Sequence, residues 1–153
     1  MKRALAIVSL GLAACGESPP PATFEPVHDM GETMRLVLDP AADVIWGSAG
    51  AIVTEDGTLD LAPTTDEGWL RVAHAAAVVA ESGNLLMMPA HAVDGEDWTE
   101  ISRGLVRVGV QARDAAEAQD ADALFEAGGR LYNVCVSCHQ QYWVDRPVRP
   151  GEA

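Results

Sequence analysis

Residues 121–143 read ADALFEAGGRLYNVCVSCHQQYW, and this stretch carries both a helical periodicity and the most specific motif of the chain. Small, apolar or aromatic side chains return at spacings of three and four, at Leu124, Gly128, Leu131, Cys135, Cys138 and Tyr142. An α-helix turns once in about 3.6 residues, so side chains at this spacing share one face. The stretch is therefore predicted to be a helix, beginning after Asp120, that buries one side against other helices.

Three earlier segments repeat the same period: residues from about 25 to 51, from about 64 to 88 and from about 95 to 118. Pro40 interrupts the first of them and predicts a kink or brief break near Asp39. A loop is expected from Thr54 to Thr65, and the sequence shows little strand signal. Thr64-Thr65-Asp66-Glu67 fits a capping box at the start of the next helix. The fold class expected is all-α, an antiparallel four-helix bundle.

The motif in the last helix is Cys135-Val136-Ser137-Cys138-His139. C-x-x-C-H is the attachment pattern of c-type haem, in which both thiols add to porphyrin vinyl groups and the histidine ligates iron. Residues i, i+3 and i+4 share a helix face, which lets both sulfurs and the imidazole meet one macrocycle. A zinc site would need further Cys or His ligands, and a thioredoxin-like dithiol would start a helix after a strand. The sequence therefore predicts one haem c, with its iron, per chain.

A helical bundle with the haem motif near its C-terminus resembles the class II cytochromes c, the cytochrome c′ family. The resemblance covers residues 24–143 and includes the Gln140-Gln141-Tyr142-Trp143 continuation, Met30-x-x-x-Met34 and Gly83-Asn84-Leu85-Leu86. It implies a haem near one end of the bundle, bound close to the C-terminal helix, with His139 as the proximal axial ligand. It also implies a distal ligand or apolar residue on the first helix. Met34 falls at that position, with Met30 as the alternative, as in the low-spin His/Met subgroup.

Other residues around the expected haem have open roles. His28, His74 and His91 are the alternatives to methionine as a distal ligand, although each is also expected as a surface or structural histidine. Arg35 and Arg130 are candidates for pairing with the haem propionates. The pair Gly128 and Gly129 permits a close approach of either the porphyrin or a neighbouring helix. The four tryptophans are expected in the core or around the haem.

The N-terminus is read as an export signal of the lipoprotein type. Met1-Lys2-Arg3 is basic, residues 4–12 are apolar but too short to span a bilayer, and Leu12-Ala13-Ala14-Cys15 resembles a bacterial lipobox. The expected organisation is a signal peptide over residues 1–14, lipidation at Cys15 and a flexible tether over 15–23. A four-helix-bundle cytochrome domain follows over 24–146, with a C-terminal tail over 147–153. The lipobox resemblance implies that the protein lies in the bacterial periplasm, with a lipid anchor in the outer membrane. No other segment reaches the length of a transmembrane helix.

The charge of the chain is strongly acidic, −13 formally, and removing Lys2 and Arg3 leaves eight basic residues against 23 acidic ones, or −15. Nucleic-acid binding needs clustered basic side chains, so it is not expected. The leading expectation is periplasmic electron transfer with partners that present basic docking surfaces. The alternative is a five-coordinate protein of the cytochrome c′ kind that binds nitric oxide or carbon monoxide. No catalytic acid–base pair or nucleophile is evident, so no enzyme is expected. The sequence leaves a monomer, a homodimer and a subunit of a larger redox enzyme open.

Overall fold

The computed structural model describes residues 24–93 and 95–143. The expected signal peptide, the tether, Cys15 and the C-terminal tail therefore lie outside the described residues. Within them the elements are α1 (Met30–Thr33), η1 (Met34–Leu38), α2 (Asp39–Trp46), β1 (Ala51–Thr54), β2 (Gly57–Asp60), α3 (Asp66–Leu86), α4 (Glu96–Glu117) and α5 (Ala121–Tyr142). The described residues are 69% helical and 7% strand.

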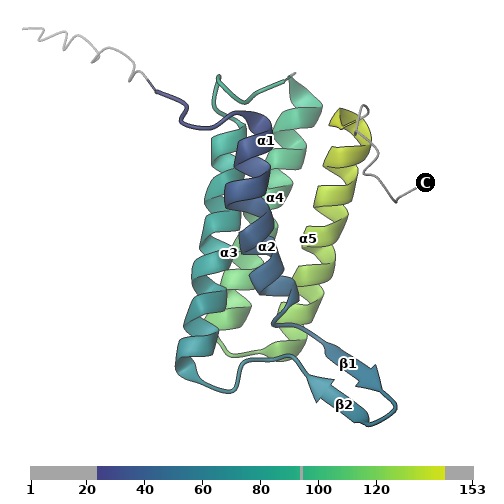
Figure 1. Ribbon diagram of the computed structural model, residues 1–153. Helices are drawn as coiled ribbons and strands as arrows, with labels where there is room; N and C mark the ends of the chain where they lie inside the picture. Colours follow the sequence, from purple (N-terminus) through teal and green to yellow (C-terminus); the bar gives the residue numbers. More distant parts are fainter. Residues whose placement is uncertain (1–23, 94, 144–153) are drawn as a thin grey trace, which may run out of the picture.

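Four helical rods pack lengthwise against one another (Figure 1). The first rod consists of α1, η1 and α2 joined end to end, and the others are α3, α4 and α5. Within the described residues α3 contacts both the first rod and α4, and α5 contacts α4 and α2. The packing of these four rods confirms the prediction of an all-α bundle of four helices. No helix among residues 24–93 and 95–143 is long and apolar enough to cross a membrane.

The first rod differs from the expected helix over residues 25–51. It begins at Met30, because Asp29 caps it: the Asp29 carboxylate accepts from the Glu32 amide at 2.7 Å, and Glu32 accepts in return from the Asp29 amide. Pro40 does not break the rod. Instead η1, a π-helical turn over Met34–Leu38, precedes α2, with Pro40 in the first turn of α2. The rod ends at Trp46, five residues before the expected end.

A β-hairpin occupies part of the expected loop. The sequence analysis did not predict it, because it found little strand signal. Strands β1 and β2 pair antiparallel, with Ile52 opposite Leu59 and Val53 opposite Thr58. Gly57 has φ 139°, a conformation that favours glycine, and it lets the chain reverse after Glu55 and Asp56. All eight strand residues are exposed. The hairpin projects from the end of the bundle opposite the end of α5 (Figure 1).

The three long helices begin close to where their capping residues predicted. Thr65 caps α3 by accepting from the Gly68 amide at 3.1 Å, and Asp120 caps α5 by accepting from the Ala123 amide at 2.9 Å. The backbone oxygen of Gly95 accepts from the Thr99 side chain at 2.7 Å in the first turn of α4. Side-chain caps thus define the starts of α3 and α5, whereas Gly95 at the start of α4 provides no side-chain cap.

Helices α3 and α4 approach closely because glycines lie at their contact. A Cβ atom on Gly109 would lie 2.5 Å from the backbone nitrogen of Ala80, and one on Gly83 would lie 2.6 Å from the backbone oxygen of Ser102. The core beside them is rich in alanine, with larger side chains from every rod; its fully buried members include Ile45, Val72, Val79, Leu124 and Leu131. Small residues thus set the separation of the two helices, and the remaining rods close around them.

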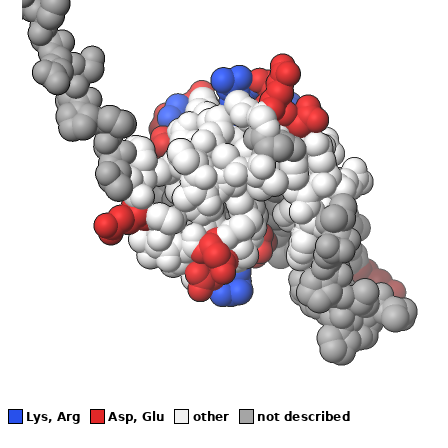
Figure 2. All heavy atoms as spheres, turned by 90° about the horizontal axis from the view of Figure 1, so that it is seen from above, with Lys and Arg blue, Asp and Glu red and all other residues white. Residues whose placement is uncertain are grey.

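The end of the bundle that holds the start of α1 and the end of α5 is seen from above in Figure 2. Its described surface is mainly uncharged, with carboxylates and a few basic groups placed around it. The first turn of α4 contributes Glu96 and Asp97, and the capping box of α1 contributes Asp29 and Glu32. Acidic groups thus collect at the positive ends of helix dipoles, which they stabilise.

Replacing Gly109 with alanine should destabilise the fold by about 1–3 kcal/mol, because the new methyl group meets the Ala80 backbone, which cannot move aside. This loss should appear although alanine favours helix by about 1 kcal/mol over glycine. Urea unfolding followed by circular dichroism measures the difference. Gly104→Ala is the matched control on the same helix, since its nearest non-local atom would be 3.6 Å away. Equal midpoints for the two variants would contradict the close packing of α3 on α4.

Candidate functional site

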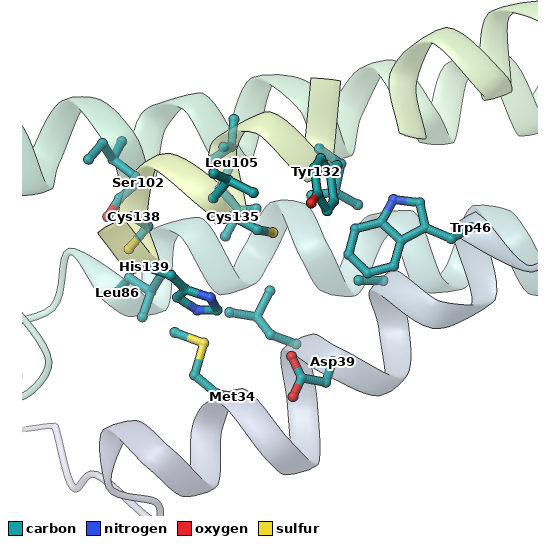
Figure 3. Close-up of a pocket in the computed structure, with 16 residues that line it drawn as sticks. Met34, Asp39, Trp46, Leu86, Ser102, Leu105, Tyr132, Cys135, Cys138 and His139 are labelled. Carbon is teal, nitrogen blue, oxygen red and sulfur yellow. The ribbon is translucent and has the colours of Figure 1, made fainter. Parts of the chain in front are cut away.

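A cavity of about 200 Å³ lies between α5 and the segment η1–α2, with α3 and α4 closing its inner side (Figure 3). Its wall is mostly apolar. Sixteen residues line it: Met34, Leu38, Asp39, Ala42, Trp46, Leu86, Ile101, Ser102, Leu105, Leu131, Tyr132, Val134, Cys135, Val136, Cys138 and His139. The side chains of Asp39 and Tyr132 are exposed, so the cavity opens to solvent beside them. A bound macrocycle would therefore extend through this opening or widen the cavity.

The C-x-x-C-H motif reaches the cavity because it continues the buried face of α5. Leu124 and Leu131 are fully buried on this helix, and Cys135 and Cys138 follow at the same spacing of three and four. Both thiols are free, half-buried and part of the cavity wall, together with the half-buried His139. The two sulfur atoms and the imidazole therefore face one space.

Burial makes these thiols poor nucleophiles. It raises the pKa of the Cys135 thiol from 9.0 to about 11, with smaller contributions from Cys138 and from the carboxylate of Asp39. Burial also raises the pKa of Cys138. Reactive dithiols of redox enzymes have the opposite shift, because they work as thiolates at neutral pH. The environment thus favours the neutral thiol form over a thioredoxin-like use of this pair.

The end of α5 is held against α4 by aromatic and polar contacts. The Trp98 indole donates to the Leu86 carbonyl at 2.7 Å, and its ring meets Tyr142 edge to face at 4.9 Å. Gln141 donates to Asp97 at 3.3 Å. The His139 ring in turn lies 4.9 Å from the Trp143 ring, nearly perpendicular to it. These contacts fix the last turn of α5 and limit the orientations open to the imidazole.

Of the two methionines on the first rod, the structure brings Met34 to the cavity. Its side chain and the His139 ring point toward one another from η1 and α5 (Figure 3). Met30 is also half-buried and packs against the core, but it is not part of the cavity wall. The sulfur of Met34 thus faces the same space as the motif, from the opposite rod.

Asp39 and Tyr132 line the cavity but were not singled out from the sequence as site residues, whereas Trp46 was expected in the core or around the haem. Trp46 donates to the Gly128 carbonyl at 3.0 Å and meets Tyr132 edge to face, with ring centroids 6.4 Å apart. Asp39 supplies a carboxylate beside a mostly apolar wall. Asp39 and Trp46 lie one and eight residues beyond the buried Leu38, so α-helical spacing places both on one side of it, but the sequence did not show that this side faces α5.

The remaining histidines lie outside the cavity wall. His28 precedes α1 and approaches Glu32 at 3.8 Å, and His74 is exposed on α3. His91 is buried in the segment that connects α3 to α4. Its Nε2 atom lies 3.3 Å from Thr33 Oγ1 and 3.2 Å from the His28 carbonyl. A carbonyl only accepts, so this Nε2 carries the proton and donates. None of the three faces Met34 or His139 across the cavity.

The arginines considered for propionate binding and the glycine pair considered for close approach all lie outside the cavity wall. Arg130 is exposed and donates to Gln111 at 2.9 Å and to Glu126 at 3.4 Å, and Arg35 is exposed on η1; neither lines the cavity. Gly128 faces Trp46, as helix packing requires, whereas a Cβ on Gly129 would meet nothing within 4 Å. Neither arginine therefore stands at the cavity wall as a partner for haem propionates.

The donor set fits a haem better than a bare metal ion. Among residues 24–93 and 95–143, no three His, Cys, Asp or Glu side chains group as a metal site. Two thiols, an imidazole and a thioether around an apolar space match the attachment and axial ligation of a c-type haem. Apolar side chains such as Leu86, Leu105 and Leu131 supply the low-polarity wall that a macrocycle needs.

None of the protein-family models, curated proteins or solved structures compared with this chain matches it. The functional interpretation therefore depends on the residues of the cavity and on their arrangement.

With both thiols free, the fold should lose stability as the pH rises from about 9 toward 11. The folded state keeps the Cys135 proton at a pH where the unfolded chain, with a pKa near 9.0, releases it. The stabilisation from this group is thus complete below pH 9 and is lost as the pH passes the raised pKa, up to about 3 kcal/mol. Urea unfolding of the haem-free chain at several pH values measures the effect. Cys135→Ala should reduce this pH dependence, and an unchanged slope would refute the buried thiol.

Proposed function

We propose that the protein is a periplasmic electron-transfer protein with one covalently bound c-type haem. The observation that carries the proposal is that Cys135, Cys138, His139 and Met34 all line one cavity. Three of them come from α5 and the fourth from the facing rod, as ligands on the two sides of one macrocycle must (Figure 3). The arrangement resembles the low-spin His/Met subgroup of the class II cytochromes c.

Each residue would have a distinct role. Cys135 and Cys138 would form the two thioether bonds, which fix the cofactor on α5. His139 would ligate the iron from the same helix, its ring orientation restricted by Trp143. When bound, the haem supplies reversible one-electron chemistry. The surrounding leucines would lower the polarity around the cofactor, which favours the less charged, reduced state.

Met34 would close the distal side. A thioether is a neutral, soft donor that suits reduced iron and leaves no free position for an external ligand. This ligation favours electron transfer over the alternative, the binding of nitric oxide or carbon monoxide at an open distal site.

The acidic chain suits partners with basic docking surfaces. Asp39 at the cavity opening and Asp43, one turn further along α2, are both exposed beside the cavity-lining Trp46. Opposite charges around a redox site accelerate encounter between partner proteins. A lipid on Cys15 would hold the protein at the periplasmic side of the outer membrane and so raise the local concentration of membrane-bound partners.

Mass spectrometry of the mature protein, made in a host that attaches c-type haem, tests both modifications. The peptide with Cys135 and Cys138 should keep one haem after denaturation, because thioether bonds resist acid and organic solvent. The N-terminal peptide should begin at Cys15 and carry lipid. Cys138→Ala should lose most of the stable haem, whereas Cys15→Ser should lose only the lipid and membrane retention.

Complete extraction of haem from the native protein by acidified solvent would refute covalent attachment. A mature N-terminus at Gly16 or beyond, without lipid, would refute the anchor while leaving the haem proposal intact.

Met34→Ala and Met30→Ala form a matched pair on the same rod. Met34→Ala should abolish the weak sulfur-to-iron band at the red edge of the visible spectrum and convert the iron to a high-spin or water-bound form. It should also raise carbon monoxide binding to the reduced protein at least about tenfold, because the distal position becomes open. Met30→Ala should leave both properties unchanged, since Met30 lies outside the cavity wall.

The reverse result, with Met30 essential and Met34 dispensable, would reassign the distal ligand. If neither substitution changes the spectrum and the native protein already binds carbon monoxide readily, the gas-binding alternative replaces electron transfer.

A further inference from the structure

Two buried anchors on the first rod lie five residues apart. Thr33 is fully buried, and its hydroxyl lies 3.3 Å from the His91 ring, which also bonds the His28 carbonyl. Leu38 is buried in the core, followed by Ala41, Ala42 and Ile45 at α-helical spacing. An α-helix buries residues three or four apart, so a five-residue interval does not fit it. The π turn η1, over Met34–Leu38, spans this interval.

The π turn also decides on which side of the rod Met34 lies. In an α-helix each residue advances about 100°, so relative to Leu38 the cavity residues Asp39, Ala42 and Trp46 lie at about 100°, 40° and 80°, all to one side. In an uninterrupted α-helix Met34 would lie about 40° to the opposite side, beside Ala41 and Ile45.

A π turn takes up nearly one residue more per revolution than an α turn, because its hydrogen bonds reach to i+5. Across the four steps from Leu38 back to Met34, this difference carries Met34 past Leu38 to the side of Ala42 and Trp46. Met34 accordingly lines the cavity and points toward His139 (Figure 3). The π turn therefore determines that the Met34 side chain faces the cavity.

Pro40 explains why the rod adopts the π register here. Proline has no amide hydrogen, so position 40 cannot donate to the Leu36 carbonyl, and its ring would crowd that carbonyl in a tight α turn. The neighbouring Asp39 amide donates instead to the Met34 carbonyl, five residues back. The wider turn relieves the crowding and supplies an alternative hydrogen bond at the same place.

We propose that Pro40 is a positioning residue for the distal ligand: it holds the π turn that turns Met34 into the cavity, while the Thr33–His91 contact fixes the segment above the turn. The consequence for iron ligation rests on the proposed function, whereas the register of the rod does not. Without proline, an α register becomes available that keeps Leu38 buried, turns Thr33 away from His91 and moves Met34 toward Ala41 and Ile45.

The test compares Pro40→Ala with native protein, both as mature holoprotein, and uses Pro63→Ala as the control. Pro63 lies before α3 and outside the cavity wall, so its replacement makes the same chemical change elsewhere. NMR of the reduced protein reports the register through the hydrogen bond from the Asp39 amide to the Met34 carbonyl. It reports the side-chain position through contacts of the Met34 methyl group with cavity residues. Absorption and carbon monoxide binding report ligation.

In Pro40→Ala the Asp39–Met34 bond should be lost, the amide at position 40 should bond to the Leu36 carbonyl, and the Met34 methyl contacts should weaken. Carbon monoxide affinity should rise at least about tenfold, while Pro63→Ala matches the native protein. Retention of the π register, or its loss without displacement of Met34, would overturn the proposal. If native iron proves not to bind Met34, the proposed distal ligand fails on its own, and the methyl contacts still decide the role of Pro40.

Discussion

The rest of the structure depends on a coincidence of faces on α5. The face that α5 buries against the other rods and the face that carries Cys135, Cys138 and His139 are the same. Near the motif this face carries two small cysteine side chains and a half-buried imidazole, and a cavity of about 200 Å³ lies beside them. The surrounding rods therefore close on the lower part of α5, around Leu124 and Leu131, and leave a space beside its last turns.

Much of this fold follows from local sequence. Helices α3, α4 and α5 begin where Thr65, Gly95 and Asp120 place their caps, and their ends fall within two residues of the periodic segments. The first rod was predicted less well, because the apolar period alone does not show where it is interrupted. Pro40 indicated a distortion, but the choice between a kink and a π turn depends on Thr33 and Leu38 both being buried, which is a tertiary constraint. The hairpin was missed because its strands are only four residues long.

The residues of the candidate site also differ in how well the sequence predicted them. Cys135, Cys138 and His139 could be assigned together because a single helix turn fixes their relative positions, whatever the rest of the chain does. Met34 could be assigned only through a resemblance, since it lies on another rod and its facing depends on the π turn. Asp39, Trp46 and Tyr132 join the cavity through contacts between rods that no local pattern encodes. Arg35 and Arg130 were chosen for charge alone, and charge does not determine which way a side chain on a helix points.

The two sides of the cavity also differ in how firmly they are held. His139 belongs to a 22-residue helix whose last turn is held by the ring contacts Trp98–Tyr142 and His139–Trp143. Met34 belongs to a five-residue π turn and is only half-buried. A π turn is a local distortion within a longer helix, so a change of its register rotates Met34 without a change in α5. The coordination of the proposed haem is therefore decided on the Met34 side. A turn that stays closed favours electron transfer, and a turn that opens would admit small ligands to the same iron.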